Sequence, residues 1–307
     1  MPGTSGTTTG IGNMLPSSLY PSLVQRRLLP RYHEISPLPA LCKKLPRIVG
    51  NQIVYGQISK STINSTTTDV WNGEVPIQAV SASSTTIPIT KVQTWGYSMP
   101  PLLEAQTPLR LMTAQLNDNA EELSDEISKQ VFADMFSGAG NQMGTIDINI
   151  ETAYFNLIDM NNTLNKLNVP KYGRRFLIDY DYLTLLQKSR GDGAYDIDPN
   201  GRVHGLKIGP YEVYATNLLT STPGTTESDG TTTNPTGQAL LIQEDAYGYL
   251  EQLGKIQYID GSTGNMSETF QGALLWGSGY LLPKNVVACT CSYTLGLPAN
   301  TEVSFDI

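Results

Sequence analysis

The chain has 307 residues, of which 39% are hydrophobic and 16% are charged, and its net charge is −8 at neutral pH. A chain of this length can bury one large core or two smaller ones. Its acidity argues against a dedicated nucleic-acid binder, because phosphate contacts need a basic face, and no apolar run approaches the roughly 20 residues of a membrane span.

Residues 1–40 are predicted to form an extended N-terminal arm. Thr and Gly dominate its start, one short helical patch covers 23–29, and prolines interrupt the rest. Residues 1–60 carry seven Lys or Arg residues against one Glu, so the remainder of the chain is strongly acidic. With few apolar side chains the arm needs a surface to dock on, and we expect the acidic body of a neighbouring copy. The candidate docking residues are Arg26, Arg27 and Arg31.

The stretch that follows alternates as strands do, over 47–59, 74–80 and 85–97. A polar segment, 61–69, lies between the first two. This pattern predicts a long hairpin-like extension with a polar, flexible tip.

The strongest helix signal covers 108–136. Thr107 and Pro108 are a favourable N-cap and first-turn pair, and Gly138 and Gly140 end the pattern. At about 1.5 Å per residue the helix would be roughly 43 Å long. Its apolar residues fall at spacings of three or four: Leu109, Met112, Leu116, Ala120, Leu123, Ile127, Val131 and Met135. Its opposite face, which we expect to meet solvent or a partner, carries Asp118, Glu121, Glu122, Asp125 and Glu126.

A second helix is predicted over 145–167, followed by the segment NVPKYGRRFLIDYDYLTLLQ at 168–187. Its apolar residues 176–178 predict a buried strand, and Asp179 stands where a helix N-cap belongs. Such strand–turn–helix units often present active sites. No partner residues for catalysis accompany this one, so we interpret it as a structural corner.

The last third is rich in strands, predicted over 203–208, 211–219, 239–243, 255–259, 269–283 and 285–295. Strands flank two or three helices without regular alternation, which predicts the α+β class. The three cysteines are an odd number, and Cys289 and Cys291 share one face of a strand, so we expect all three to be reduced packing residues.

Catalytic and metal-binding patterns are weak. The chain has two histidines, His33 and His204, and no nucleophile elbow, phosphate loop or paired Cys motif, so we expect no enzyme activity, no cofactor and no metal. Asp196, Asp198 and Asn200 copy the start of a calcium loop, but its twelfth position is Lys207 rather than Glu. We therefore interpret 196–201 as a plain turn, and the Arg-Gly-Asp tripeptide at 190–192 as chance.

The order of these elements resembles the major capsid proteins of tailed bacteriophages, which have the Hong Kong 97-type fold. The resemblance covers the chain from about residue 23 to 291 and rests most on 168–187, on VHGLKIGPYEVYATNLL, and on GALLWGSGYLLPKNVVACTC. It implies a shell-forming structural protein of the virion, assembled in the host bacterial cytoplasm. The implied partners are further copies in hexamers and pentamers, portal, scaffolding and decoration proteins, and double-stranded DNA enclosed without sequence-specific binding, with no membrane.

The resemblance also implies a division of the chain. We expect the N-terminal arm at 1–40, the extended loop and peripheral strands at 41–104, the spine helix at 105–144, the axial domain at 145–251, peripheral strands at 252–275, and closing axial strands at 276–307. Many relatives begin with a scaffolding region that a protease removes. The sequence has no such helical, charged segment before the arm, which implies a separate scaffold or none.

Some members of this fold join subunits covalently between a Lys and an Asn. The candidates for such a cross-link are Lys60, Asn265 and the carboxylate of Glu268. Two other functions stay open: an encapsulin-like nanocompartment with the same fold, and a β-rich carbohydrate-binding or adhesive domain. The lack of a signal peptide counts against the last.

Overall fold

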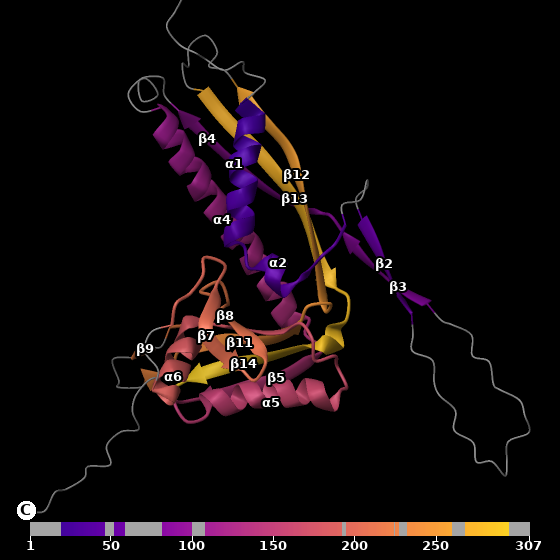
Figure 1. The fold of residues 1–307 in the computed structure, drawn as a ribbon, viewed down its shortest axis with the longest axis vertical. Coiled ribbons are helices and arrows are strands. Elements are labelled where there is room, and N and C mark those ends of the chain that lie inside the picture. The colour runs from indigo at the N-terminus through magenta and orange to yellow at the C-terminus, as the bar shows by residue number, and fades with distance from the viewer. Residues whose placement is uncertain are drawn as a thin grey trace, which may run out of the picture.

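The structure, a computed structural model, describes residues 20–46, 52–58, 82–99, 108–191, 195–223, 225–226, 232–259 and 268–294. These residues form two layers and a projecting hairpin (Figure 1). The long layer is a four-stranded sheet backed by α1 and α4, and the six-stranded layer is a second sheet with α5 and α6.

The elements follow in chain order. They are α1 (Tyr20–Ile35), α2 (Leu38–Leu41), β1 (Lys43–Lys44), β2 (Gln52–Ile58), β3 (Ala82–Pro88), β4 (Lys91–Met99), α4 (Pro108–Ser137), β5 (Asn141–Ile148), α5 (Ala153–Lys166), β6 (Arg174–Ile178), α6 (Tyr180–Arg190), β7 (Arg202–Ile208), β8 (Tyr211–Ala215), β9 (Thr225–Thr226), β10 (Thr232–Thr233), β11 (Thr236–Gln243), β12 (Tyr247–Ile259), β13 (Glu268–Tyr280), the 3-10 helix η1 (Pro283–Asn285) and β14 (Val286–Tyr293).

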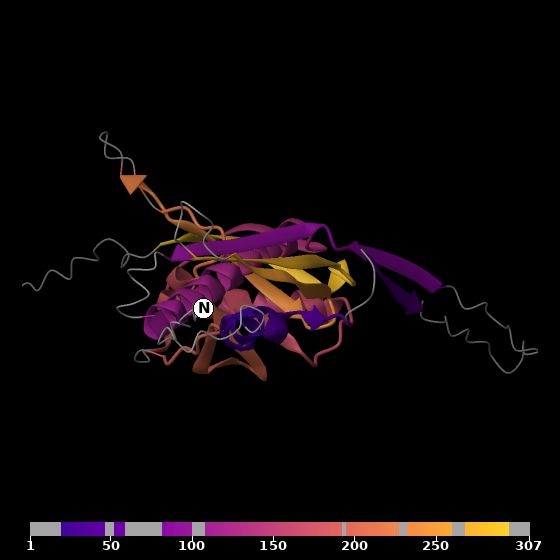
Figure 2. The ribbon, with the colours of Figure 1, turned by 90° about the horizontal axis from the view of Figure 1, so that it is seen from above.

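The predicted spine helix is confirmed as α4. Its apolar stripe is buried from Leu116 to Met135 because residues three and four apart share the face that meets the sheet. The long sheet has the order β1-β12-β13-β4, and α1 and α4 lie on one side of it (Figure 2). From β13, Phe270, Leu274 and Trp276 complete this core.

The expectation that the arm needs a surface outside its own chain is wrong for its described part. Helix α1 packs against α4 and β12 of the same chain, and Val24, Leu28 and Tyr32 are buried in their core. These side chains are four residues apart, so they line one face of the helix. Pro30 lies on the exposed face inside α1, and the helix continues through it although proline has no N–H to donate to the carbonyl of Arg26.

The predicted hairpin is confirmed where the structure describes it. Strands β2 and β3 pair antiparallel, from Gln52 opposite Pro88 to Ile58 opposite Ala82, and the expected strand at 74–80 lies outside the described residues. The single strand expected at 85–97 is two, since β4 leaves the hairpin and joins β13. A side chain at Gly277 would clash with the carbonyl of Pro88, so glycine lets the hairpin base rest on β13.

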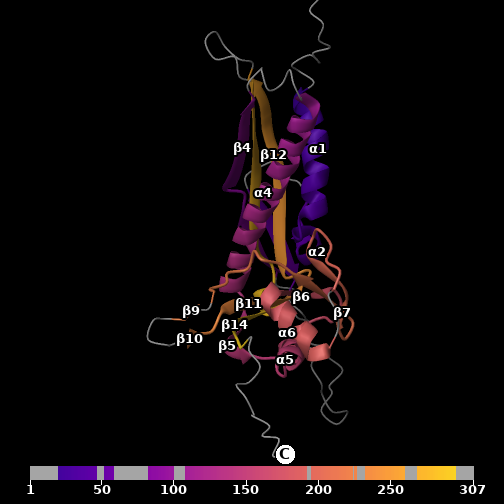
Figure 3. The same ribbon diagram turned by 90° about the vertical axis from the view of Figure 1, so that its left-hand side faces the viewer.

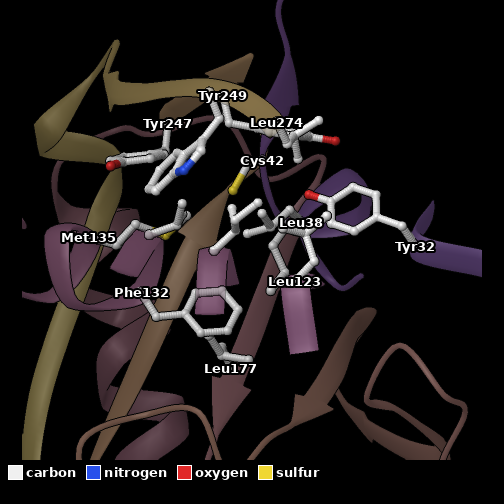
Figure 4. Close-up of a cluster of buried hydrophobic side chains, with 14 of the residues drawn as sticks. Tyr32, Leu38, Cys42, Leu123, Phe132, Met135, Leu177, Tyr247, Tyr249 and Leu274 are labelled. Atoms are coloured by element: carbon white, nitrogen blue, oxygen red, sulfur yellow. The ribbon is translucent and has the colours of Figure 1, made fainter. Parts of the chain in front are cut away.

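The six-stranded sheet has the order β5-β14-β11-β6-β8-β7, with β6 parallel to β8 and β5 parallel to β14. Helices α5 and α6 pack on one face. The other face meets the C-terminal half of α4, where Leu177 of β6 lies near Phe132 (Figure 4). One shared core therefore joins the two layers.

The helix expected over 145–167 is wrong at its start. Residues 145–148 belong to β5, which runs beside β14 and buries Ile148, and α5 begins at Ala153. The break comes at Asn149, whose side-chain carbonyl accepts hydrogen bonds from the backbone N–H groups of Glu151 and Thr152. This local turn competes with a helix.

The chain crosses between layers at different places from those expected. It leaves the six-stranded sheet after Gln243, enters the long sheet at Tyr247 and returns at Val286. The sequence instead predicts that the chain changes domain at 251–252 and at 275–276. Strands β12 and β13 pair along most of their length, which keeps both wholly within the long layer.

Candidate subunit interface

The basic residues of α1 divide into two groups. Arg31 reaches the acidic face of α4 as predicted, but within its own chain: its Nη2 lies 3.0 Å from Oε1 of Glu121 and its Nη1 lies 3.1 Å from Oε2 of Glu34. Its hydrogen bonds to Glu121 and then Glu34 raise its pKa. Arg26 and Arg27 lie exposed on the same helix and remain candidates for contact with another copy.

The acidic residues of α4 do not form one face. Glu121 points toward α1, and Asp125 lines a small cleft of about 100 Å³ with Ile35 and Tyr180. Burial, followed by the charge of Glu121, raises the pKa of Asp125. Glu122 and Glu126 lie on the opposite side, toward β4, and Asp118 is exposed. Only some of these carboxylates are therefore open to a partner.

A groove of about 320 Å³ runs between β4 and α4. Residues 93–96 form one wall, and Asn119, Glu122, Leu123 and Glu126 form the other. The side-chain nitrogen of Asn119 is buried and has no hydrogen-bond partner among the described residues. We call this the β4–α4 groove. The sequence does not predict this groove, because nothing in residues 91–99 indicates that β4 pairs with β13 alone among the described strands.

A second charged cluster fastens α1 to the sheet. The buried Oε1 of Glu251 lies 2.6 Å from Nε2 of His33, and Nζ of Lys44 also bonds to it. Burial alone would raise the pKa of Glu251, but the bonds from His33 and Lys44 outweigh it and leave the pKa lowered. The cluster ties α1, β1 and β12 together.

The strand–turn–helix segment is confirmed as a structural corner. Asp179 caps α6 by accepting a hydrogen bond from the backbone N–H of Tyr182, at 2.8 Å, and its other oxygen accepts one from the hydroxyl of Tyr293, at 2.7 Å. Arg174 is buried and donates to the carbonyls of Val169 and Pro170. Local hydrogen bonds therefore occupy both the carboxylate of Asp179 and the guanidinium of Arg174.

The turn at 196–201 is confirmed: the backbone N–H of Gly201 donates to the carbonyl of Asp198, and the side chain of Asn200 accepts from the N–H of Arg202. No three metal-binding side chains gather anywhere in the described part of the chain. All three cysteines are free and buried. None of the described helices is long and apolar enough to cross a membrane.

The cross-link candidates stay a prediction. Lys60 and Asn265 lie outside the described residues. Glu268 begins β13, opposite Met99 of β4.

Comparison with family models and with curated proteins found no match. Solved structures do match. The capsid structure of cyanophage P-SCSP1u is 13% identical, with 82% of this chain and 87% of that chain covered and a TM-score of 0.57. The mature capsid of bacteriophage PhiM1 is 12% identical, with 87% of each chain covered and a TM-score of 0.54. A virus-like particle from Pyrococcus furiosus is 13% identical, with 88% of this chain and 99% of that chain covered and a TM-score of 0.56.

These likenesses span both layers and nearly the full length of the matched chains. The chain therefore has the Hong Kong 97-type capsid fold, as its order of elements indicated.

Proposed function

We propose that the chain is the major capsid protein of a tailed bacteriophage and assembles into the icosahedral shell that encloses its double-stranded DNA. The observation that carries the proposal is the likeness to capsid subunits over most of both chains. The hairpin, which projects from the body in Figure 1, supports it, because a segment that packs little on its own subunit is available to a neighbour.

The chemistry of the chain agrees with this role. Several charged residues, among them Arg31, Glu251 and Asp179, are engaged in ion pairs or a helix cap, and we propose that the protein has no catalytic activity of its own. An acidic container repels the DNA that it encloses and so does not hold it tightly. The proposed partners are other copies of the chain, in hexamers and pentamers, with portal, scaffolding and decoration proteins in the virion. Assembly would take place in the bacterial cytoplasm.

Sedimentation and negative-stain microscopy of the expressed chain test the proposal. We expect closed particles or ring-shaped capsomers whose amount rises with protein concentration. A species that stays monomeric at every concentration, also after co-expression with the neighbouring genes, would contradict it.

A nanocompartment shell is the second candidate, favoured by the match to all but a small part of the Pyrococcus furiosus chain. The contents of native particles separate the two. Packaged double-stranded DNA supports the phage capsid, and a single enriched protein cargo supports the compartment.

A further inference from the structure

The β4–α4 groove gathers side-chain oxygens from two elements that lie apart in the sequence. Strand β4 and helix α4 run side by side in the long layer (Figure 3), with the groove of about 320 Å³ between them. From α4, the groove is lined by Asn119, Glu122 and Glu126, which follow at spacings of three and four and so share one face of the helix. From β4 comes Gln93, on the same face of the strand as the buried Trp95.

The groove is acidic and has no cation of its own. Glu122 is exposed on its wall and Glu126 is half-buried there, and no Lys, Arg or His belongs to the described residues that line it. Lys91, on the same strand, is held by Asp134 at 2.8 Å. Two carboxylates four residues apart on one helix repel each other, and a cation bound between them removes this repulsion.

The amide of Asn119 is a second observation that points to a ligand. Asn119 is only 9% exposed, and its side-chain nitrogen is buried without a hydrogen-bond partner among the described residues. A half-turn of the amide about its Cβ–Cγ bond exchanges the nitrogen and the oxygen, so that a cation in the groove can supply the missing partner. At the other end of the groove, Nε2 of Gln130 donates to Oε1 of Glu126 at 2.9 Å and orients that carboxylate.

We propose that the β4–α4 groove binds a divalent cation, Ca²⁺ in preference to Mg²⁺, through the carboxylates of Glu122 and Glu126 and the amide oxygens of Asn119 and Gln93. Calcium takes about six to eight oxygen ligands in a flexible arrangement, and water fills the remaining positions on the open side. Magnesium demands near-octahedral geometry and gives up its water reluctantly, so it binds such a groove more weakly.

The site differs from the sequence-based expectation of no metal because its ligands come from a helix and a strand whose contact the spacing of residues does not show. It contains two carboxylates rather than three, and its other ligands are neutral oxygens. Sites of low ligand charge hold calcium with dissociation constants of about 0.1–1 mM. Binding ties the edge strand β4 to α4 and does not depend on the proposed shell function.

Calorimetric titration of the full-length chain with CaCl₂, in about 0.15 M NaCl to screen weak surface attraction, tests the site. We expect saturable binding of one Ca²⁺ per chain in the range above, at least about threefold weaker binding of Mg²⁺, and a melting temperature that rises with Ca²⁺ concentration. The absence of saturable binding up to about 10 mM Ca²⁺ would overturn the inference. That result would leave the shell function intact, since particle formation tests it separately.

A matched set of variants locates the ion. Glu122→Gln with Glu126→Gln should weaken Ca²⁺ binding at least about tenfold, because both charged ligands are lost. Asp118→Asn with Asp125→Asn removes the same charge from the same helix outside the groove, and should change the affinity less than about twofold. Asn119→Asp adds a third carboxylate and should tighten binding about tenfold. Equal losses in the two double variants would mean that Ca²⁺ follows the general charge of the helix as an adventitious ion only, and unchanged or weaker binding in Asn119→Asp would remove that residue from the site. Either result overturns the inference, and melting temperatures without Ca²⁺ verify that each variant is folded.

Discussion

Among the described residues, nearly every buried polar side-chain atom of the six-stranded layer has a hydrogen-bond partner, whereas several such atoms of the long layer have none. Among the described residues, Gln238 is the exception in the six-stranded layer. In the long layer the buried atoms without a partner are Nε of Arg31 and Oε2 of Glu251, whose other atoms form ion pairs, and side-chain atoms of Tyr32, Trp95, Tyr97, Asn119, Ser124, Ser128, Tyr249 and Trp276. A buried group without a partner costs about 1–3 kcal/mol.

The bonds of the six-stranded layer show the opposite arrangement. Asn156 donates to the hydroxyl of Tyr182, which donates to the carbonyl of Ala153 at 2.8 Å. Asp179 takes bonds from two sides, and Arg174 is surrounded by acceptors. A fully satisfied network of this kind fixes one packing arrangement. We infer that the six-stranded layer is the rigid part of the subunit and that the long layer is the part able to rearrange when neighbours bind.

The largest expected effect comes from removing α1. Deleting residues 1–35 exposes the apolar face of α4 and β12 that Val24, Leu28 and Tyr32 cover, so the product should aggregate or lose its cooperative unfolding transition. Deleting residues 1–19 should leave a soluble subunit with a nearly unchanged melting temperature. Thermal unfolding of the two truncations measures the difference. If both behave alike, α1 contributes little to the core of the subunit.

The corner of the six-stranded layer should be the next most sensitive place. Asp179→Ala removes the cap of α6 and leaves the hydroxyl of Tyr293 buried without its acceptor, so the free energy of unfolding should fall by about 2–4 kcal/mol. Asp181→Ala, two residues on in the first turn of α6, is the control and should cost less than about 1 kcal/mol. Denaturant unfolding of both variants measures the costs, and similar values would mean that the corner is not a stabilising network.

The sequence predicts some elements of the fold and not others. Local signals were enough for α4, for the Asp179 cap and for most strands, because periodicity and capping depend on neighbouring residues. They failed for α1, where Pro30 and the basic residues hid a buried stripe of three side chains. They also failed for β5, whose strand form depends on pairing with β14, far along the chain.

The candidate interface was less predictable than the fold. The spacing of the acidic run 118–126 predicts one face, but α1 and β4 pack on different sides of α4 and divide it. Which carboxylate stays open depends on tertiary contacts that spacing along one helix does not contain.

A single type of substitution compares the two layers directly. Tyr182→Phe removes the donor to the carbonyl of Ala153 and the acceptor of Asn156, so it should destabilise the subunit by about 1–2 kcal/mol. Tyr249→Phe removes a buried hydroxyl that has no partner among the described residues, so it should be neutral or stabilising. The denaturant midpoints of the two variants show whether each substitution raises or lowers the stability of the subunit. Destabilisation of equal size would show that Tyr249 is satisfied in solution, for instance by a buried water.

The smallest expected effect is a dependence of α1 on acid. The pKa of Glu251 is lowered in the folded subunit by its bonds to His33 and Lys44. The unfolded chain therefore binds a proton more readily, and the stability from this carboxylate is present above its unfolded pKa, near 4.3, and is lost as pH falls through the lower folded value. Protonation also removes the charge that holds Lys44, on the strand beside α1. We expect α1 to become more sensitive to proteolysis than the six-stranded layer as the pH falls below about 4.

Two variants separate this cluster from the general acid response of the chain. Glu251→Gln removes the ionisable group, so the cleavage rate of α1 should already be raised at neutral pH and should change less on acidification. Asp134→Asn removes an exposed carboxylate of the same layer, paired with Lys91 at 2.8 Å, and should keep the pH dependence of the parent. Limited proteolysis across the acid range, with fragments identified by mass, gives both slopes. If Glu251→Gln and Asp134→Asn show the same slope as the parent, another carboxylate controls the release of α1. The long layer would still have more buried atoms without a partner among the described residues, but Glu251, which meets both α1 and β1, would not control the attachment of α1.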